Sequence, residues 1–238
     1  MRGEITSGKK SKRHPLDWCV DEHWCAEQLA IALNEFGFEW EADLAVWDPS
    51  CGMGNTLQAA WQRGIRTYGS DLVDNFAWSE FEGLPALPQP KHFIADFLET
   101  EEAPDDCSIV CNPPYSYIDG IAERFVRHAL KLATKHVCML LPVKWLAPGV
   151  DQKEWSNRSS LFRKEHPPLA IMPMSQRPSM PPGDMIGALG SRAFKGGMVD
   201  YCWIVWDVSR PTATNETRVL WLPPLIKNHE IQPLEEAK

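Results

Sequence analysis

The sequence predicts an α/β domain built on a doubly wound, mostly parallel sheet of seven strands. Three observations support this fold class. The expected strands are short apolar runs separated by helical patterns, as in parallel sheets that are buried on both faces. A glycine-containing loop joins the first strand to a helix, and a proline-rich loop follows the fourth strand. The expected strands are Leu44–Trp47, Arg66–Ser70, His92–Ala95, Ser108–Val110, His136–Leu141, Leu169–Met172 and Tyr201–Asp207.

Chain length indicates one domain with additions at both ends. An α/β domain formed from most of these 238 residues buries most of the surface that its unfolded chain exposes. We expect the domain to span residues 17–208, between a polar, basic tail at 1–16 and a C-terminal extension at 209–238. Solvated, disordered chain is the favoured interpretation of the tail over an arm that follows nucleic acid.

The charge balance limits the possible partners. A net charge of −8 and a pI near 5.4 argue against a protein whose whole surface binds nucleic acid. Any contact with nucleic acid therefore requires a local basic patch.

Cysteine usage and hydropathy indicate a soluble cytoplasmic protein. The 7 cysteines form no C-x-x-C pair, so we expect reduced thiols and no metal site. No apolar run approaches the roughly 18 to 20 residues that span a membrane, and no signal-peptide core follows the basic start. A membrane partner is not expected.

The loop after the first strand predicts a ligand site. Asp48-Pro49-Ser50-Cys51-Gly52-Met53-Gly54 follows the strand and precedes a helical pattern, and its glycines allow close approach of a ligand. The loop matches neither G-x-G-x-x-G nor the phosphate-binding G-x-x-x-x-G-K-[ST], which excludes dinucleotide and ATP sites. Asp71 ends the second strand at a spacing, about 20 residues, where such folds bind ribose hydroxyls. A surface aspartate is the less favoured alternative.

A second loop predicts the chemistry. Asn112-Pro113-Pro114-Tyr115 follows the fourth strand, and its prolines have fixed φ angles and no N–H groups. The Asn112 amide stays free to hydrogen-bond a ligand, while Tyr115 offers a stacking face. These groups suit a planar substrate that carries an NH2 group. A proline-bounded turn with no ligand is the alternative for these four residues taken alone.

Both loops resemble those of S-adenosylmethionine-dependent amino-methyltransferases, chiefly the DNA N6-adenine methyltransferases. Gln176-Arg177-Pro178-Ser179-Met180 and the Trp-rich run Tyr201–Asp207 are similar to the closing part of the small phage and prophage enzymes. The resemblance implies the class I, Rossmann-like methyltransferase fold and covers about residues 17–208. It implies that Asp48 meets the ammonium group of the cofactor and that Ser50, Gly52 and Gly54 make room for it. It further implies that Asp71 binds the ribose and that Leu72, Asp96 and Phe97 surround the adenine.

The segment before the first helix departs from this family. Relatives often carry a Thr-Pro pair there, whereas this chain reads Asp17-Trp18-Cys19-Val20-Asp21-Glu22. Trp18 is either part of the cofactor pocket or a packing tryptophan.

Basic residues are frequent in the segment that follows the fifth expected strand. We expect Lys144, Arg158, Arg163, Lys164 and Arg177 to contact DNA phosphates, with Trp145, Trp155 and Phe162 available to bases. A solvated helix and loop is an equally weighted alternative. Since no separate recognition domain is visible, target recognition is expected from residues 143–165 and 175–197.

The resemblance implies transfer of the S-adenosylmethionine methyl group to the N6 amine of adenine in DNA. Hydrogen bonds to the Asn112 side chain and the Pro113 carbonyl would favour a nucleophilic nitrogen, and Tyr115 would hold the flipped base. Two alternatives stay open. One is methylation of a release-factor glutamine or of an RNA amine, and the other is a noncatalytic DNA-binding protein that keeps the fold.

Overall fold

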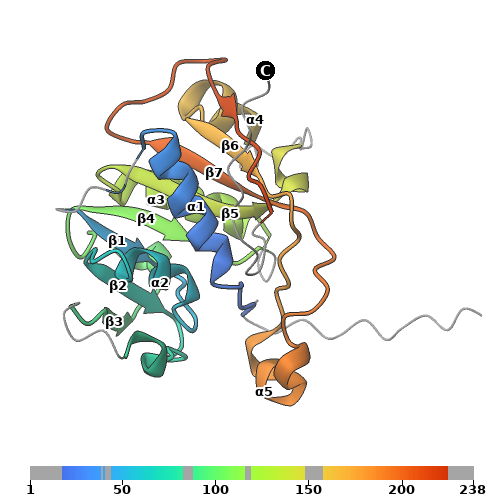
Figure 1. Ribbon diagram of the computed structural model, residues 1–238. Coiled ribbons are helices and arrows are strands. Elements are labelled where there is room, and N and C mark those ends of the chain that lie inside the picture. The colour runs from blue at the N-terminus through green and yellow to red at the C-terminus, as the bar shows by residue number, and fades with distance from the viewer. Residues whose placement is uncertain are drawn as a thin grey trace, which may run out of the picture.

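An eight-stranded sheet forms the centre of the molecule, in the order β3-β2-β1-β4-β5-β7-β6-β8 (Figure 1). The computed structural model describes residues 18–38, 40, 44–82, 88–115, 119–147 and 158–224. The predicted fold class is confirmed, and all seven expected strands form. The eighth strand, β8, lies in the expected C-terminal extension. The strands are β1 Ala45–Asp48, β2 Thr67–Asp71, β3 Lys91–Ile94, β4 Cys107–Cys111, β5 His136–Pro142, β6 Ala170–Pro173, β7 Tyr201–Asp207 and β8 Arg218–Val219.

The chain reverses its direction of travel across the sheet between β1 and β4. From β1 it moves outward to β2 and β3, and it then returns to place β4 on the other side of β1. The β1 and β4 strands run parallel, with Trp47 opposite Ile109. The loops that leave their carboxyl ends diverge there, which opens a crevice suited to a ligand.

β7 brings a distant loop to the same edge. It runs antiparallel between β5 and β6, so that Tyr201 at its start lies opposite Pro142 at the end of β5. The connection between β6 and β7 therefore begins and ends at the carboxyl edge of the parallel strands. This connection includes α5 (Ile186–Leu189), which stands away from the sheet in Figure 1.

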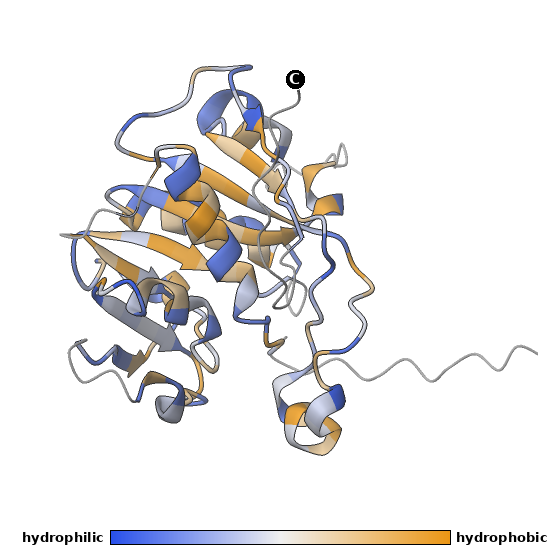
Figure 2. Cartoon of the chain, in the orientation of Figure 1, coloured by the Kyte–Doolittle hydropathy of each residue, from blue (hydrophilic) through white to orange (hydrophobic). Residues whose placement is uncertain are grey.

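Helices cover both faces of the sheet. Alternate residues of a strand point to opposite faces, so Val46 packs with α1 (Trp24–Glu35) and α2 (Asn55–Trp61), and Trp47 packs with α3 (Ile121–Leu132). Figure 2 shows the resulting concentration of hydrophobic residues along the central strands. Shorter elements are α4 Arg158–Ser160, a π turn at Leu161–Glu165, and 3-10 turns at Trp78–Phe81, Phe97–Glu99, Val143–Leu146, Gly183–Met185 and Gly190–Arg192.

The segment before α1 pairs with part of the β6–β7 connection, residues 179–183, which we call the strap. Cys19 and Pro182 form an antiparallel bridge. The Val20 N–H donates to the Pro181 carbonyl at 3.0 Å, and the Gly183 N–H donates to the Trp18 carbonyl at 3.1 Å. The strap thus fixes residues 18–20 at the carboxyl edge of the sheet. The predicted tail, residues 1–16, lies outside the described residues.

Candidate functional site

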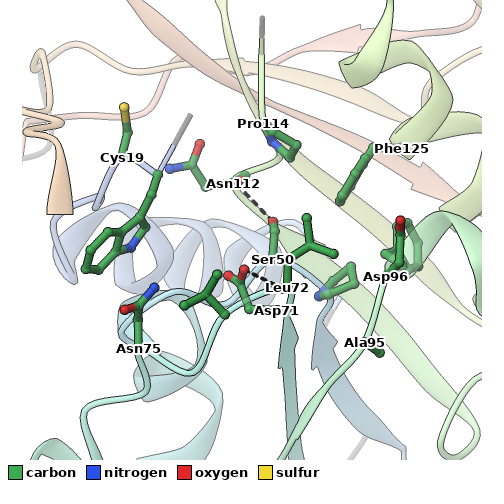
Figure 3. A pocket seen from close by; sticks show the side chains of 14 residues that line it. Cys19, Ser50, Asp71, Leu72, Asn75, Ala95, Asp96, Asn112, Pro114 and Phe125 are labelled. Atoms are coloured by element: carbon green, nitrogen blue, oxygen red, sulfur yellow. Dashed lines mark hydrogen bonds between the residues drawn. The ribbon is translucent and has the colours of Figure 1, made fainter. Parts of the chain in front are cut away.

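A cavity of about 330 Å³ opens at the carboxyl ends of β1 to β4. Figure 3 shows Asn112 and Pro114 on one side of it, Asp71, Leu72 and Asn75 on the opposite side, and Ser50 between them. The volume lies at the lower end of the range of small-molecule sites, about 300 to 1,000 Å³. Its lining is Trp18, Cys19, Pro49, Ser50, Asp71, Leu72, Val73, Asn75, Ala95, Asp96, Phe97, Asn112, Pro114 and Phe125. We call it the first cavity.

Asp71 presents a fixed carboxylate to this cavity. Its Oδ2 accepts a hydrogen bond from the Gly52 N–H at 2.9 Å, and its Oδ1 accepts one from the Leu72 N–H at 2.7 Å. The backbone of Val73 is a third hydrogen-bond partner of this carboxylate. A carboxylate has about four lone-pair sites, so some acceptor capacity remains for a ligand. Burial raises the pKa of Asp71, against the effect of these backbone hydrogen bonds.

Asp48 does not line the first cavity, and it stabilises the glycine loop instead. Its side chain is buried, and its Oδ1 accepts the Ser50 N–H at 3.0 Å. Gly54 also serves the fold, since it has a φ of +92°, and a Cβ there would lie 2.8 Å from the Phe76 ring. The space that the sequence assigns to a ligand at Gly54 is filled by aromatic side chains.

Ser50 and Tyr115 hold the Asn-Pro-Pro-Tyr loop in place. The Ser50 hydroxyl donates to the Asn112 carbonyl oxygen at 3.1 Å, which ties the β1 loop to the β4 loop. The Tyr115 hydroxyl contacts Asn112 Oδ1 as a donor and lies 3.0 Å from the Leu140 carbonyl oxygen. Burial raises the pKa of Tyr115 well above its ordinary value of 10.0, so this hydroxyl keeps its proton. Pro113 is buried and does not line the first cavity.

A second cavity of about 400 Å³ lies on the Tyr115 side of the motif. Within the motif, Asn112 and Pro114 line the first cavity and Tyr115 lines the second. The Tyr115 ring packs against both core clusters, and its centroid is 6.0 Å from that of Tyr201. The second cavity is lined by Tyr115, Asp119, Gly120, Ala122, Glu123, Pro142, Lys144, Trp145, Arg158, Val199 and Tyr201.

The remaining residues predicted to bind the cofactor surround the first cavity. Leu72 is 41 % exposed at its rim, and Phe97 packs edge-on against Trp47. Asp96 is exposed, and its Oδ1 accepts the Leu98 N–H at 2.9 Å. Trp18 forms part of the wall and lies against Gly183 of the strap.

The predicted DNA contacts divide into three groups. Lys144 and Arg158 line the second cavity, and the Arg158 guanidinium lies 5.1 Å from the centre of the Trp145 ring. Arg163 and Lys164 are exposed on the π turn. Arg177 is exposed and forms an ion pair of 2.6 Å with Asp200.

Trp145 and Phe162 of this region pack against other rings. Trp145 is 8 % exposed, and Phe162 packs edge-on against Trp145 and stacks on Trp206. Trp145 nevertheless lines the second cavity, so the availability of these two rings to bases stays a prediction. Trp155 lies outside the described residues.

Some site residues were not predicted. Asn75, Ala95 and Phe125 line the first cavity, and Asp21 contacts Asn112 from outside that lining. Nothing in the local sequence marks the first three. Asp21 was visible only as an acid in the segment that departs from the family pattern.

Two buried carboxylates, Asp21 and Asp48, and the partly buried carboxylate of Asp71 give this region its electrostatic character. Burial raises the pKa of Asp21, Asp48 and Asp71, and Asp48 is affected further by the other two. A cationic ligand would favour the ionised carboxylates and lower all three pKa values. The first cavity is therefore suited to a ligand that carries positive charge together with hydrogen-bond donors.

Across the described ranges, no cluster of three or more His, Cys, Asp or Glu side chains is placed to hold a metal ion. In the same part of the chain, no helix is long and apolar enough to cross a membrane.

Comparison with known proteins identifies the fold. No protein-family model and no curated protein sequence matches the chain. A protein from Listeria monocytogenes, described as a class I S-adenosylmethionine-dependent methyltransferase, is 13 % identical with a TM-score of 0.58 over 92 % of this chain and 70 % of that one. A protein from Pyrococcus horikoshii, described as an RNA methyltransferase, is 16 % identical with a TM-score of 0.56 over 85 % and 92 % of the two chains.

A third similar structure is DrdV, solved in complex with DNA. It is 11 % identical with a TM-score of 0.55, over 88 % of this chain and 28 % of that chain. At these identities the likeness concerns the fold alone. Together with the strand order and the antiparallel β7, it shows that this chain has the fold of the class I S-adenosylmethionine-dependent methyltransferases.

Proposed function

We propose that this protein transfers the methyl group of S-adenosylmethionine to the N6 amine of adenine in DNA. The observation that carries the proposal is the place of the Asn-Pro-Pro-Tyr loop. Asn112 and Pro114 line the first cavity beside the Asp71 carboxylate, and Tyr115 lines the second cavity. A cofactor in the first cavity and a substrate base in the second would then meet at Asn112.

The first cavity fits S-adenosylmethionine in its polar and apolar parts. The acceptor capacity that remains on the Asp71 carboxylate suits the ribose hydroxyl groups. Leu72 and Phe97 offer apolar contacts for an adenine ring, and the exposed Asp96 carboxylate suits its amine. The buried acids Asp48 and Asp21 favour the positive charges of the methionine part, although neither lines the cavity.

The residues of the motif would position the attacking amine. The nitrogen of an adenine amine is a poor nucleophile because its lone pair is delocalised into the ring. An N–H donated to Asn112 Oδ1 would favour the pyramidal nitrogen. The resemblance assigns a second N–H to the Pro113 carbonyl oxygen, but Pro113 is buried and lines neither cavity. In the reaction, the N–C bond forms as the methyl C–S bond breaks, the sulfur keeps the electron pair, and the amine then loses a proton to water.

Positioning is the main contribution of the protein to this reaction. Well-oriented reactions gain up to roughly 7 to 11 kcal/mol from it. The cofactor supplies an activated methyl group, so no strong general base is required.

The second cavity and its surroundings suit the DNA substrate. A base in a duplex must leave the stack before its amine can reach Asn112. Lys144 and Arg158 line this cavity, and their positive charges would suit the phosphates on either side of a flipped base. A local patch of this kind is compatible with the overall net charge of −8.

The proposal is tested by incubating the full chain with cofactor carrying a labelled methyl group and with DNA, RNA or a protein extract. We expect label in DNA, recovered as N6-methyladenine by mass spectrometry, and label incorporated about a hundredfold or more slowly with Asn112→Ala. N4-methylcytosine, methylated RNA or methylglutamine would replace the substrate assignment. No transfer to any of these substrates, with intact cofactor binding, would favour the noncatalytic alternative.

A further inference from the structure

Asp21 is held rigidly beside Asn112. Its side chain is 7 % exposed, and its Oδ2 accepts a hydrogen bond from Thr56 Oγ1 at 3.2 Å. The Asp21 backbone carbonyl accepts a second one from Asn55 Nδ2 at 2.7 Å. Both donors belong to the first turn of α2, so the end of this helix fixes the position of the carboxylate.

The contact between Asp21 and Asn112 selects one orientation of the Asn112 amide. The strap brings the two residues together, because Val20 pairs with Pro181 and the neighbouring Met180 contacts Asn112. A hydrogen bond from the Asn112 side chain opposes the rise in the Asp21 pKa. An ionised carboxylate only accepts hydrogen bonds, so it takes Nδ2 as its partner. The contact with Met180 supports the same orientation of the amide, because the Met180 sulfur is a weak acceptor and lies 3.9 Å from Nδ2. In Figure 3 the amide nitrogen is turned toward the side from which Cys19 projects.

The opposite end of the amide faces the substrate side. The Tyr115 hydroxyl donates to Oδ1 of Asn112, and Tyr115 lines the second cavity. Oδ1 has two lone pairs, so one remains for a donor other than Tyr115. Asp21 and Tyr115 therefore hold the amide from its two ends.

We propose that Asp21 is a positioning residue, whose carboxylate holds Nδ2 of Asn112 so that Oδ1 is presented to the substrate amine. The inference rests on the proposed function, since it gives Asn112 the task of orienting that amine. Asp21 itself does not line the first cavity, so it acts through Asn112 and not through direct contact with the cofactor.

The protonation state of Asp21 decides whether this arrangement holds. Burial raises the pKa of Asp21 from its ordinary value of 3.8 to about 6, while the hydrogen bonds from Thr56 and Asn112 oppose the rise. A protonated carboxyl group gains an O–H donor, which favours Oδ1 as its partner and turns the amide over. Nδ2 would then face Tyr115, and it cannot accept a hydrogen bond from an amine. The ionisable groups that act on Asp21 are Glu22, Cys25, Asp48, Cys111 and Tyr115.

The contact can be tested without any activity, by nuclear magnetic resonance of the ¹⁵N-labelled full chain. The side-chain NH2 signals of Asn112 are identified by their loss in Asn112→Ala. We expect these signals to shift with pH around the Asp21 pKa of about 6 and to lose that titration in Asp21→Asn. Signals that respond neither to pH nor to Asp21→Asn overturn the proposal.

The consequence is tested by kinetics at saturating cofactor. Asp21→Asn, which keeps the size of the side chain but not its charge, should lower kcat about tenfold with cofactor affinity within about threefold. It should also abolish the fall of kcat between about pH 7 and pH 5 that the parent shows as Asp21 is protonated. Asp184→Asn, at an exposed acid one residue beyond the strap, should change neither quantity.

Other kinetic outcomes contradict the positioning role. A large loss of cofactor affinity with unchanged kcat would make Asp21 a cofactor ligand, and an unaltered kcat and pH profile would leave it no role in the reaction. If the parent transfers no methyl group to any substrate, the proposed function fails, and the resonance experiment still decides whether Asp21 orients Asn112.

Discussion

The hydroxyl group of Tyr115 donates a hydrogen bond to Oδ1 of Asn112, the amide that faces the first cavity. The same hydroxyl lies 3.0 Å from the Leu140 carbonyl oxygen in β5. Tyr115 therefore connects the motif to the centre of the sheet, in addition to the stacking role that the sequence predicts. This connection changes the expected effect of removing the hydroxyl.

Tyr115→Phe should slow methyl transfer about five- to tenfold. The stacking role alone predicts a variant that remains substantially active, because the ring is kept. The structure adds the loss of a buried hydrogen bond, worth about 1 kcal/mol, that holds Asn112. Single-turnover rates check this, with Tyr68→Phe as control, because the Tyr68 hydroxyl bonds Asp105 away from both cavities. Equal rates for Tyr115→Phe and the parent would show that the hydroxyl does not hold Asn112.

Asp71→Ala should weaken cofactor binding at least tenfold. It removes hydrogen bonds to a charged group, each worth about 1.5 to 3 kcal/mol. Calorimetry measures the change, and Asp74→Ala, at an exposed acid that does not line the first cavity, should leave the affinity unchanged. The same affinity in Asp71→Ala and the parent would remove Asp71 from the site.

The pH dependence of binding gives an independent check on Asp71. Burial raises its pKa above the ordinary value of 3.8. Protonation removes an acceptor, so affinity should be full at higher pH and decline as the pH falls through this raised pKa. The part of the decline that is due to Asp71 should be missing in Asp71→Ala.

Local signals explain why the sheet was predictable and parts of the site were not. The apolar run Leu44–Trp47 became β1 with a shift of one residue at each end, because burial on both faces leaves a continuous hydrophobic pattern. The two residues of β8 are exposed and carry no such pattern. The two ligand loops could be predicted because their glycines and prolines act locally. Glycine allows backbone conformations that other residues avoid, and proline fixes its own φ angle.

The sequence could not predict the roles of site residues that depend on contacts with residues far away in the chain. Asp48 ends a strand as the family pattern requires, yet its carboxylate bonds the Ser50 N–H, outside the lining of the first cavity. Asp21 acquires its role only through Asn112, which belongs to another loop. Trp145 lies in a basic segment of the sequence, but tertiary packing buries its ring.

Gly183→Ala should reduce cofactor affinity about fivefold or more. A Cβ at this position would lie 2.1 Å from the Trp18 ring, so the ring must leave the wall of the first cavity or the strap must shift. Overpacking of this kind costs about 1 to 3 kcal/mol. The matched control is Gly187→Ala, whose Cβ meets nothing within 4 Å. Titration of each variant with cofactor, followed by fluorescence, measures the two affinities. Identical affinities would show that Trp18 is not part of the wall of the cofactor site.

Replacing Arg158 and Arg163 together by Ala should weaken DNA binding and flatten its dependence on salt. Each lost phosphate contact lowers the slope of log K against log salt by about one unit. Arg177→Ala should have a smaller effect, because Asp200 already pairs with that guanidinium. Binding measured at several salt concentrations gives the slopes. An unaltered slope in the double variant would identify the basic segment as an ordinary solvated surface.

Asn112→Ala should separate chemistry from binding. Its side-chain amide lines the first cavity beside Ser50 and Asp71, but the cofactor contacts proposed for Asp71, Leu72 and Phe97 remain in the variant. Cofactor affinity should therefore stay within about threefold of the parent, while the methylation rate falls about a hundredfold or more, on the order of 3 kcal/mol of barrier. Calorimetry and single-turnover methylation of the same preparation measure the two quantities. A variant that methylates DNA as fast as the parent would show that the Asn112 side chain does not orient the amine, and the role proposed for Asp21 would then fail with it.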